Sequence, residues 1–123
     1  MCLYSKQKNP IIANNNIECY KILISIDGKL ITPYRDFIFG INTIVKDEAE
    51  EHISEVFGMT EVSSGFFHSF TTKERVLEEI ETLQRKFPKG TKLKVFKAII
   101  PKGSIYYVGQ RSDMCSKALI IME

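Results

Sequence analysis

The run Gly65-Phe66-Phe67-His68-Ser69-Phe70-Thr71-Thr72 joins a strand-like segment to the start of a helix. Thr71, with Glu74 three residues later, has the spacing of a capping box, in which both side chains bind backbone N–H groups of the first turn. Apolar residues then recur with helical spacing until a proline and a glycine follow. This pattern predicts a strand followed at once by a helix that runs to about Arg85.

Short strands account for most of the other apolar segments. Asp27-Gly28 is a typical two-residue hairpin turn, and it separates strand-like residues 18–26 from residues 30–32. Further strands are predicted for residues 92–100, 105–108 and 118–122, whereas residues 37–41 fit either an edge strand or a buried loop.

Residues 47–57 predict a second, shorter helix. Asp47 and Glu50 again have capping-box spacing, Ile53 and Val56 fall on one helical face, and Gly58 follows as a stop. The fold class expected from all these segments is α+β, a twisted and mainly antiparallel sheet with one or two helices in a single domain. Residues 1–16 are polar and predict a mobile or loosely docked N-terminal leader, so the domain is expected to span residues 17–123.

Length and composition are those of one ordinary globular domain. The chain has 123 residues, of which 44% are hydrophobic and 26% are charged. Its apolar runs are too short to span a membrane and its start lacks a secretory signal, so we expect a cytoplasmic protein. The three cysteines, Cys2, Cys19 and Cys115, are odd in number and far apart, which predicts reduced thiols and no metal site.

Charge is distributed unevenly along the chain. Residues 84–111 contain eight lysines and arginines and no carboxylate, whereas residues 46–61 contain six carboxylates and one lysine. Such segments are compatible with a plain solvated surface, with attraction of phosphates or acidic proteins to the basic segment, and with self-association through opposite charges.

His68 is the first candidate for a functional side chain. It titrates near neutral pH and is flanked by aromatic rings, so it fits either a ligand contact or a satisfied core histidine. Ser69 points to the opposite face of the same strand, because successive strand residues alternate, and therefore cannot act with His68 as a nucleophile and base pair.

Other polar and aromatic residues are expected near one end of the sheet. Arg35 can clamp a phosphate or carboxylate with its planar guanidinium, or it can simply pair with Asp36 at the surface. Lys102 lies in a glycine turn that lacks Walker spacing, and only one of the adjacent tyrosines 106 and 107 is expected to be exposed. The predicted ligand-binding set is Tyr20, Lys21, Tyr34, Arg35, Phe67, His68, Ser69, Lys102, Tyr106 and Tyr107.

Three segments carry a resemblance to known sequences: Cys19-Tyr20-Lys21, Gly65–Phe70 and Ile100–Gly109. Together with Thr32-Pro33-Tyr34 and the opening Met1–Gln7, they resemble short uncharacterised proteins of Bacteroides-type gut bacteria and their phages. The order of the glycine-led strand and the Pro101-Lys102-Gly103 turn is also similar to the mono-ADP-ribosyltransferase fold. That fold carries a catalytic glutamate near its last strand, and residues 105–122 of this chain contain no glutamate.

Three functions remain open at this point. The first is a non-enzymatic binding module of phage or mobile-element type, which captures a phosphate-bearing nucleotide ligand or a host protein in the host cytoplasm. The second is a nucleotide-acting enzyme with a degenerate ADP-ribosyltransferase-like fold, in which His68 is the acid or base and Arg35 or Lys102 holds phosphate. The third is a structural or assembly protein that forms a homo-oligomer. We expect no cofactor, no metal, no membrane and no nucleic acid as partner.

Overall fold

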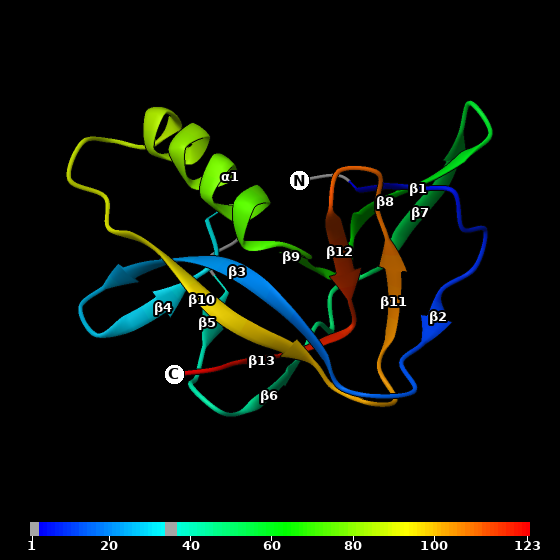
Figure 1. Ribbon diagram of the computed structural model, residues 1–123, viewed down its shortest axis with the longest axis horizontal. Coiled ribbons are helices and arrows are strands. Elements are labelled where there is room, and N and C mark those ends of the chain that lie inside the picture. The colour runs from blue at the N-terminus through cyan, green and yellow to red at the C-terminus, as the bar shows by residue number, and fades with distance from the viewer. Residues whose placement is uncertain (1–2, 34–36) are drawn as a thin grey trace.

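Two sheets and one helix make up residues 3–33 and 37–123, which are the residues described by the computed structural model (Figure 1). The larger sheet has ten strands, and its main path runs β2-β11-β12-β9-β3-β10-β13-β6, with β4 beside β3 and β5 beside β4. The smaller sheet has the order β1-β8-β7. The elements are β1 (Leu3–Ser5), β2 (Ile11–Ile12), β3 (Ile17–Ile26), β4 (Lys29–Ile31), β5 (Ile38–Phe39), β6 (Ile44–Lys46), β7 (His52–Val56), β8 (Met59–Ser64), β9 (Phe67–Phe70), α1 (Lys73–Lys86), β10 (Leu93–Ile100), β11 (Ile105–Val108), β12 (Asp113–Ser116) and β13 (Ala118–Ile121).

The fold is thus α+β, dominated by antiparallel sheet, with one helix among the described residues. Its longest ladder joins β3 to β10, from Leu93 opposite Ile24 to Ile100 opposite Ile17. The predicted strands at residues 18–26, 30–32, 92–100, 105–108 and 118–122 are all present within a residue or two of their expected ends. No helix in the described part of the chain is long and apolar enough to cross a membrane.

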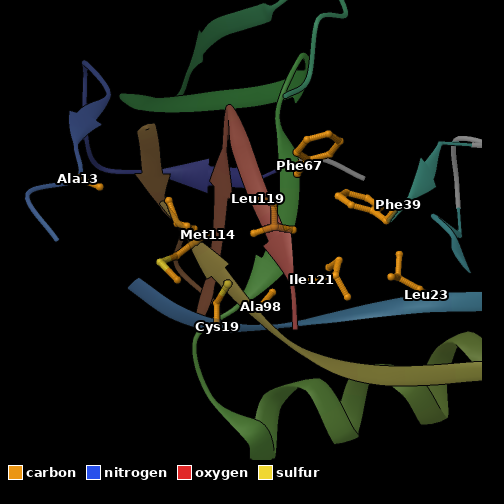
Figure 2. Close-up of a cluster of buried hydrophobic side chains, with 10 residues drawn as sticks. Ala13, Cys19, Leu23, Phe39, Phe67, Ala98, Met114, Leu119 and Ile121 are labelled. Atoms are coloured by element: carbon orange, nitrogen blue, oxygen red, sulfur yellow. The ribbon is translucent and has the colours of Figure 1, made fainter. Parts of the chain in front are cut away.

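Alternation along β3 builds a core on each side of the larger sheet. Cys19 and Leu23 face the main core, in which side chains from several strands and the loops between them meet (Figure 2). Ile22 and Ile24 face the other way, where α1 covers them with Val76 and Leu83. A third cluster joins the two sheets and consists of Leu3, Val62, Phe66, Tyr107 and Cys115.

The helix begins one residue later than the sequence pattern indicates. The N-cap is Thr72, whose side-chain oxygen accepts a hydrogen bond from the backbone N–H of Arg75 at 3.2 Å. Thr71 still belongs to the extended segment, because its backbone N–H donates to the carbonyl of Ser112. Adjacent threonines offer the same capping chemistry, and the pairing of Thr71 with the β11–β12 loop selects the second.

The N-terminal segment is packed against the domain, which differs from the loosely docked leader predicted for residues 1–16. Leu3 and Ser5 are buried as β1 pairs with β8, and the buried Ala13 donates its backbone N–H to the carbonyl of Ser104. Most residues of this segment are polar, and only a few of them are buried. Its overall composition therefore does not reveal that alternate residues of the segment pack against the domain.

The short helix predicted for residues 47–57 is wrong, because these residues form a loop and strand β7, the first arm of the β7–β8 hairpin. The Asp47 carboxylate accepts a hydrogen bond from the N–H of Ala49, only two residues on, which closes a turn and caps no helix. Phe57 and Gly58 have positive φ values of 50° and 75° and reverse the chain. Pairing with β8 thus overrides a helical spacing of apolar residues.

Candidate functional site

His68 and Asp113 form a largely buried pair of polar side chains on adjacent strands. Strand β9 pairs with β12 so that Cys115 lies opposite His68 and Asp113 lies opposite Phe70. The His68 Nε2 and Asp113 Oδ2 atoms are 3.1 Å apart, and their side chains are 14% and 11% exposed. The Phe70 ring packs edge-on against the imidazole, with 5.1 Å between ring centres.

The β11–β12 loop holds the Asp113 carboxylate in place. The backbone N–H of Arg111 donates to Asp113 Oδ1 at 3.2 Å, and the N–H of Gly109 donates to the Asp113 carbonyl at 2.8 Å. A Cβ atom at Gly109 would lie 2.0 Å from Asp113 Oδ1. Any larger residue at position 109 would therefore have to displace the Asp113 carboxylate.

The pair is expected to combine a neutral imidazole with an ionised carboxylate at neutral pH. Burial lowers the pKa of His68 below 6.5 and outweighs the opposing hydrogen bond with Asp113. Burial alone would raise the pKa of Asp113, but the hydrogen bond and charge of His68 and the N–H of Arg111 outweigh it, so that pKa is lowered from 3.8. His68 can then donate Nε2–H to Asp113.

A small cavity lies beside His68 beneath α1. The amine of Lys21 donates a hydrogen bond to the backbone carbonyl of His68 at its edge. The cavity measures about 50 Å³, which is room for a few water molecules or a small anion. Its described lining consists of Lys21, Ile22, Pro33, His68, Phe70, Glu79 and Leu83.

Arg75 links the helix to this region. Its Nη1 is 3.1 Å from Glu79 Oε2, its Nε donates to the carbonyl of Arg111, and its guanidinium lies over the Phe70 ring at 5.2 Å. The charges of Arg75 and Glu79 are therefore largely balanced by each other. The arrangement fixes the first half of α1 against β9 and the β11–β12 loop.

The thiols near the site are poor nucleophiles. Burial raises the pKa of Cys115, opposite His68, to about 12. Burial likewise raises the pKa of Cys19 to about 11, against a hydrogen bond with Ser69. Both cysteines are free and protonated at neutral pH. Within residues 3–33 and 37–123, no cluster of three or more His, Cys, Asp or Glu side chains could hold a metal ion.

The structure brings together only part of the predicted ligand-binding set. Lys21 and His68 meet at the cavity. Phe67 and Ser69 lie on the other face of β9, where Phe67 is part of the main core and Ser69 is fully buried. Tyr34 and Arg35 lie outside the described residues.

The remaining predicted residues are distributed over the domain. Tyr20 packs at the edge of the cluster beneath α1, Tyr106 packs against the main core, and Tyr107 is buried against Phe66 in the third cluster. Lys102 lies in the β10–β11 turn, where its backbone N–H donates to the side chain of Asn16. The two adjacent tyrosines do point to opposite faces, but neither is among the exposed hydrophobic residues.

A second candidate site lies at the tip of the β7–β8 hairpin, which extends away from the rest of the molecule (Figure 1). Phe57 at this tip is 100% exposed and has a φ of 50°. Sequence reasoning missed it by placing Phe57 on a helix. The available signal was Phe57-Gly58 itself, a possible two-residue turn between Val56 and Met59.

Comparison of the chain with models of protein families, with curated proteins and with solved structures finds no match.

Proposed function

We propose that this chain is a non-enzymatic binding module that holds a partner protein through the tip of the β7–β8 hairpin. The observation that carries the proposal is the complete exposure of Phe57 in a left-handed backbone conformation. The resemblance to phage-borne sequences favours a host protein as the partner. The acidic residues of the same segment favour a partner surface that is basic around an apolar pocket.

Phe57 costs the folded state conformational free energy at this turn. Two-residue turns with positive φ at both positions favour Asn, Asp or Gly, because bulky side chains crowd the backbone there. A fully exposed ring gains no burial that could offset this strain. Strained backbone at exposed positions is typical of binding and switch regions, and aromatic side chains dominate the energetics of protein interfaces.

Two further observations support binding without catalysis. His68 faces a cavity with room for a few waters, and the thiol opposite it is protonated at neutral pH. The close side-chain partner of its Nε2 is the Asp113 carboxylate, which orients the ring and supplies no nucleophile.

Photo-cross-linking tests the proposal in the cell that naturally makes the protein. Phe57 is replaced by p-benzoylphenylalanine, and the matched control carries the same group at Leu77, an exposed apolar residue on α1. We expect one defined protein adduct from position 57 and none from position 77. Excess unlabelled wild-type chain should compete, and Phe57→Asn should compete at least about thirtyfold less well, because loss of an aromatic hot spot costs about 2 kcal/mol. Equal adducts at both positions, or equal competition by Phe57→Asn, would contradict the proposal.

The second candidate function is capture of a phosphate-bearing ligand at the His68 cavity, favoured by the Lys21 amine at its edge. An open polar depression of about 600 Å³ shares Glu79 with this cavity and offers space for the rest of a nucleotide. Its lining includes the cations Arg75, Lys86 and Arg111 and the carboxylates Glu78 and Glu79. Calorimetric titration with inorganic phosphate and with a nucleotide panel tests it. His68→Ala should weaken binding and Lys102→Ala should not. Conversion of the nucleotide during the titration would instead favour a nucleotide-acting enzyme. If no titration produces binding heat, both the ligand-capture and the enzyme hypotheses are wrong.

A further inference from the structure

The outer edge of β7 is open among the described residues. In the smaller sheet the order is β1-β8-β7, so β7 pairs with β8 on one side only. Residues 52–55 are all exposed, and Val56 is half-buried. The strand contains neither lysine nor proline, two residues that commonly protect a sheet edge from further pairing.

The register of the hairpin identifies which backbone groups face outward. Val56 lies opposite Met59 across the two-residue turn, so these two residues exchange hydrogen bonds with each other. Hydrogen-bonded and non-hydrogen-bonded pairs alternate along an antiparallel ladder. Ser54 therefore bonds to Glu61 on β8, and the N–H and C=O groups of Ile53 and Glu55 point away from the sheet.

Charge at this edge selects the kind of strand that fits it. Carboxylates lie in and next to the hairpin: Glu55 on β7, opposite Thr60, Glu61 on β8, opposite Ser54, and Glu48 and Glu50 in the loop before it. Lys8 lines a surface depression together with Ile53 and Glu55 and balances part of this charge. A second copy of this chain pairing edge to edge would bring the same carboxylates together from both sides, which is destabilising. A segment with basic side chains is attracted instead.

We propose that an extended basic segment of the partner pairs with the outer edge of β7 and adds a strand to the smaller sheet next to Phe57. The inference deepens the proposed function and rests on it. Main-chain hydrogen bonds to Ile53 and Glu55 supply a general affinity, the carboxylates select lysine or arginine, and the Phe57 ring anchors the end of the added strand.

Amide hydrogen exchange tests the pairing residue by residue. In the free protein, the N–H groups of Ser54 and Val56 should exchange slowly and those of Ile53 and Glu55 rapidly. The probe is a ten-residue peptide of alternating lysine and valine, and its control alternates glutamate and valine. We expect the basic peptide to slow exchange at Ile53 and Glu55 by at least about tenfold, and the acidic peptide to leave both unchanged.

Two substitutions at one position separate backbone pairing from charge. Glu55→Gln removes the charge and should weaken the basic peptide several-fold, mostly at low salt. Glu55→Pro removes the charge and also an outward N–H, and it should abolish the pairing. Because that N–H makes no bond to β8, slow exchange at Met59 and Glu61, which pair with Val56 and Ser54, verifies that the hairpin of the proline variant is still formed.

Several results would overturn the added strand. They are equal protection by the acidic peptide, protection that leaves Ile53 and Glu55 unchanged, and concentration-dependent protection without peptide, which would assign the edge to a second copy. Failure of the proposed function is distinguishable from these. If cross-linking through Phe57 yields no partner while the basic peptide still protects the edge, the edge site stands alone. If a partner is captured and Ile53 and Glu55 stay unprotected in the complex, only the added strand fails.

Discussion

The β3–β4 and β7–β8 hairpins turn with almost the same backbone and very different side chains. Asp27 and Gly28 have φ values of 49° and 77°, and Phe57 and Gly58 have 50° and 75°. Asp-Gly is a favoured pair for this conformation, whereas phenylalanine is not. The first turn follows from local chemistry. The second keeps a residue that local chemistry disfavours, and its fully exposed ring is the contact that we propose for a partner.

The hairpins also differ in how they are attached. Strand β3 is held by β9 and β10 as well as by β4, while the β7–β8 pair reaches the larger sheet through β1 and the Gly65 segment. At that junction Lys117 lies 3.0 Å from the Glu51 carboxylate and donates to the Gly65 carbonyl at 2.8 Å. The base of the second hairpin is thus clamped even though its tip is free.

Substitution at this base should have the largest effect. Gly65 has a φ of 89°, and an added Cβ would lie 2.7 Å from the Cα of Glu51. Gly65→Ala therefore combines left-handed strain with a backbone clash and should cost about 2–5 kcal/mol of unfolding free energy. Gly40→Ala is the control, because its nearest contact is an ordinary 3.6 Å. Urea denaturation measures the unfolding free energy of both variants. A Gly65→Ala protein as stable as the control would show that the backbone at the junction shifts to accommodate the added Cβ at no cost.

Replacement of either turn glycine by alanine is expected to lower the unfolding free energy by the same amount. Neither Gly28 nor Gly58 has a neighbour within 4 Å of an added Cβ, so alanine at either position meets only the strain of positive φ. Each substitution should lower the unfolding free energy by about 1–2 kcal/mol. A much larger loss for Gly58→Ala than for Gly28→Ala in the same denaturation series would mean that the second turn is held by more than its backbone.

The two turns also explain where the sequence was informative. Asp27-Gly28 lies between strongly apolar strands, so turn chemistry and alternation agree and predict the hairpin. Phe57-Gly58 follows Ile53 and Val56 at helical spacing, whereas β7 pairs with β8, and β8 pairs on its other side with β1, far away in the sequence. Local patterns contain no information about such partners.

The candidate site near His68 shows the same division. Strand β9, the helix after it and the choice of His68 as a candidate functional side chain were predictable from one continuous stretch of sequence. Asp113 was missed because it is 45 residues away and is positioned by the close approach of Gly109. Tyr107 is buried where the two sheets pack together, and Ser69 is buried on the same face of β9 as Phe67, and alternation alone could not assign either burial.

Acid should weaken the body of the domain through His68 and Asp113. Because burial lowers the pKa of His68 below 6.5, the unfolded chain binds the extra proton first, and stability falls as the pH drops below about 6.5. The limiting slope for one such group is about 1.4 kcal/mol per pH unit. Asp113, with its pKa lowered from 3.8, adds a further loss below about pH 3.8.

A pH series of urea denaturations, with His68→Gln as the matched variant, measures this dependence. The variant should show a flatter profile between pH 7 and pH 5 than the wild-type chain. Parallel profiles would place the titrating groups elsewhere in the molecule.

Substitution of the first residue of each turn tests most directly whether Phe57 serves binding at a cost to stability. In one urea denaturation series, Phe57→Asn should raise the unfolding free energy by about 1 kcal/mol, because asparagine tolerates the left-handed conformation, and Asp27→Phe should lower it by a similar amount. A loss of stability in Phe57→Asn would show that the ring contributes to the fold, and would contradict the account.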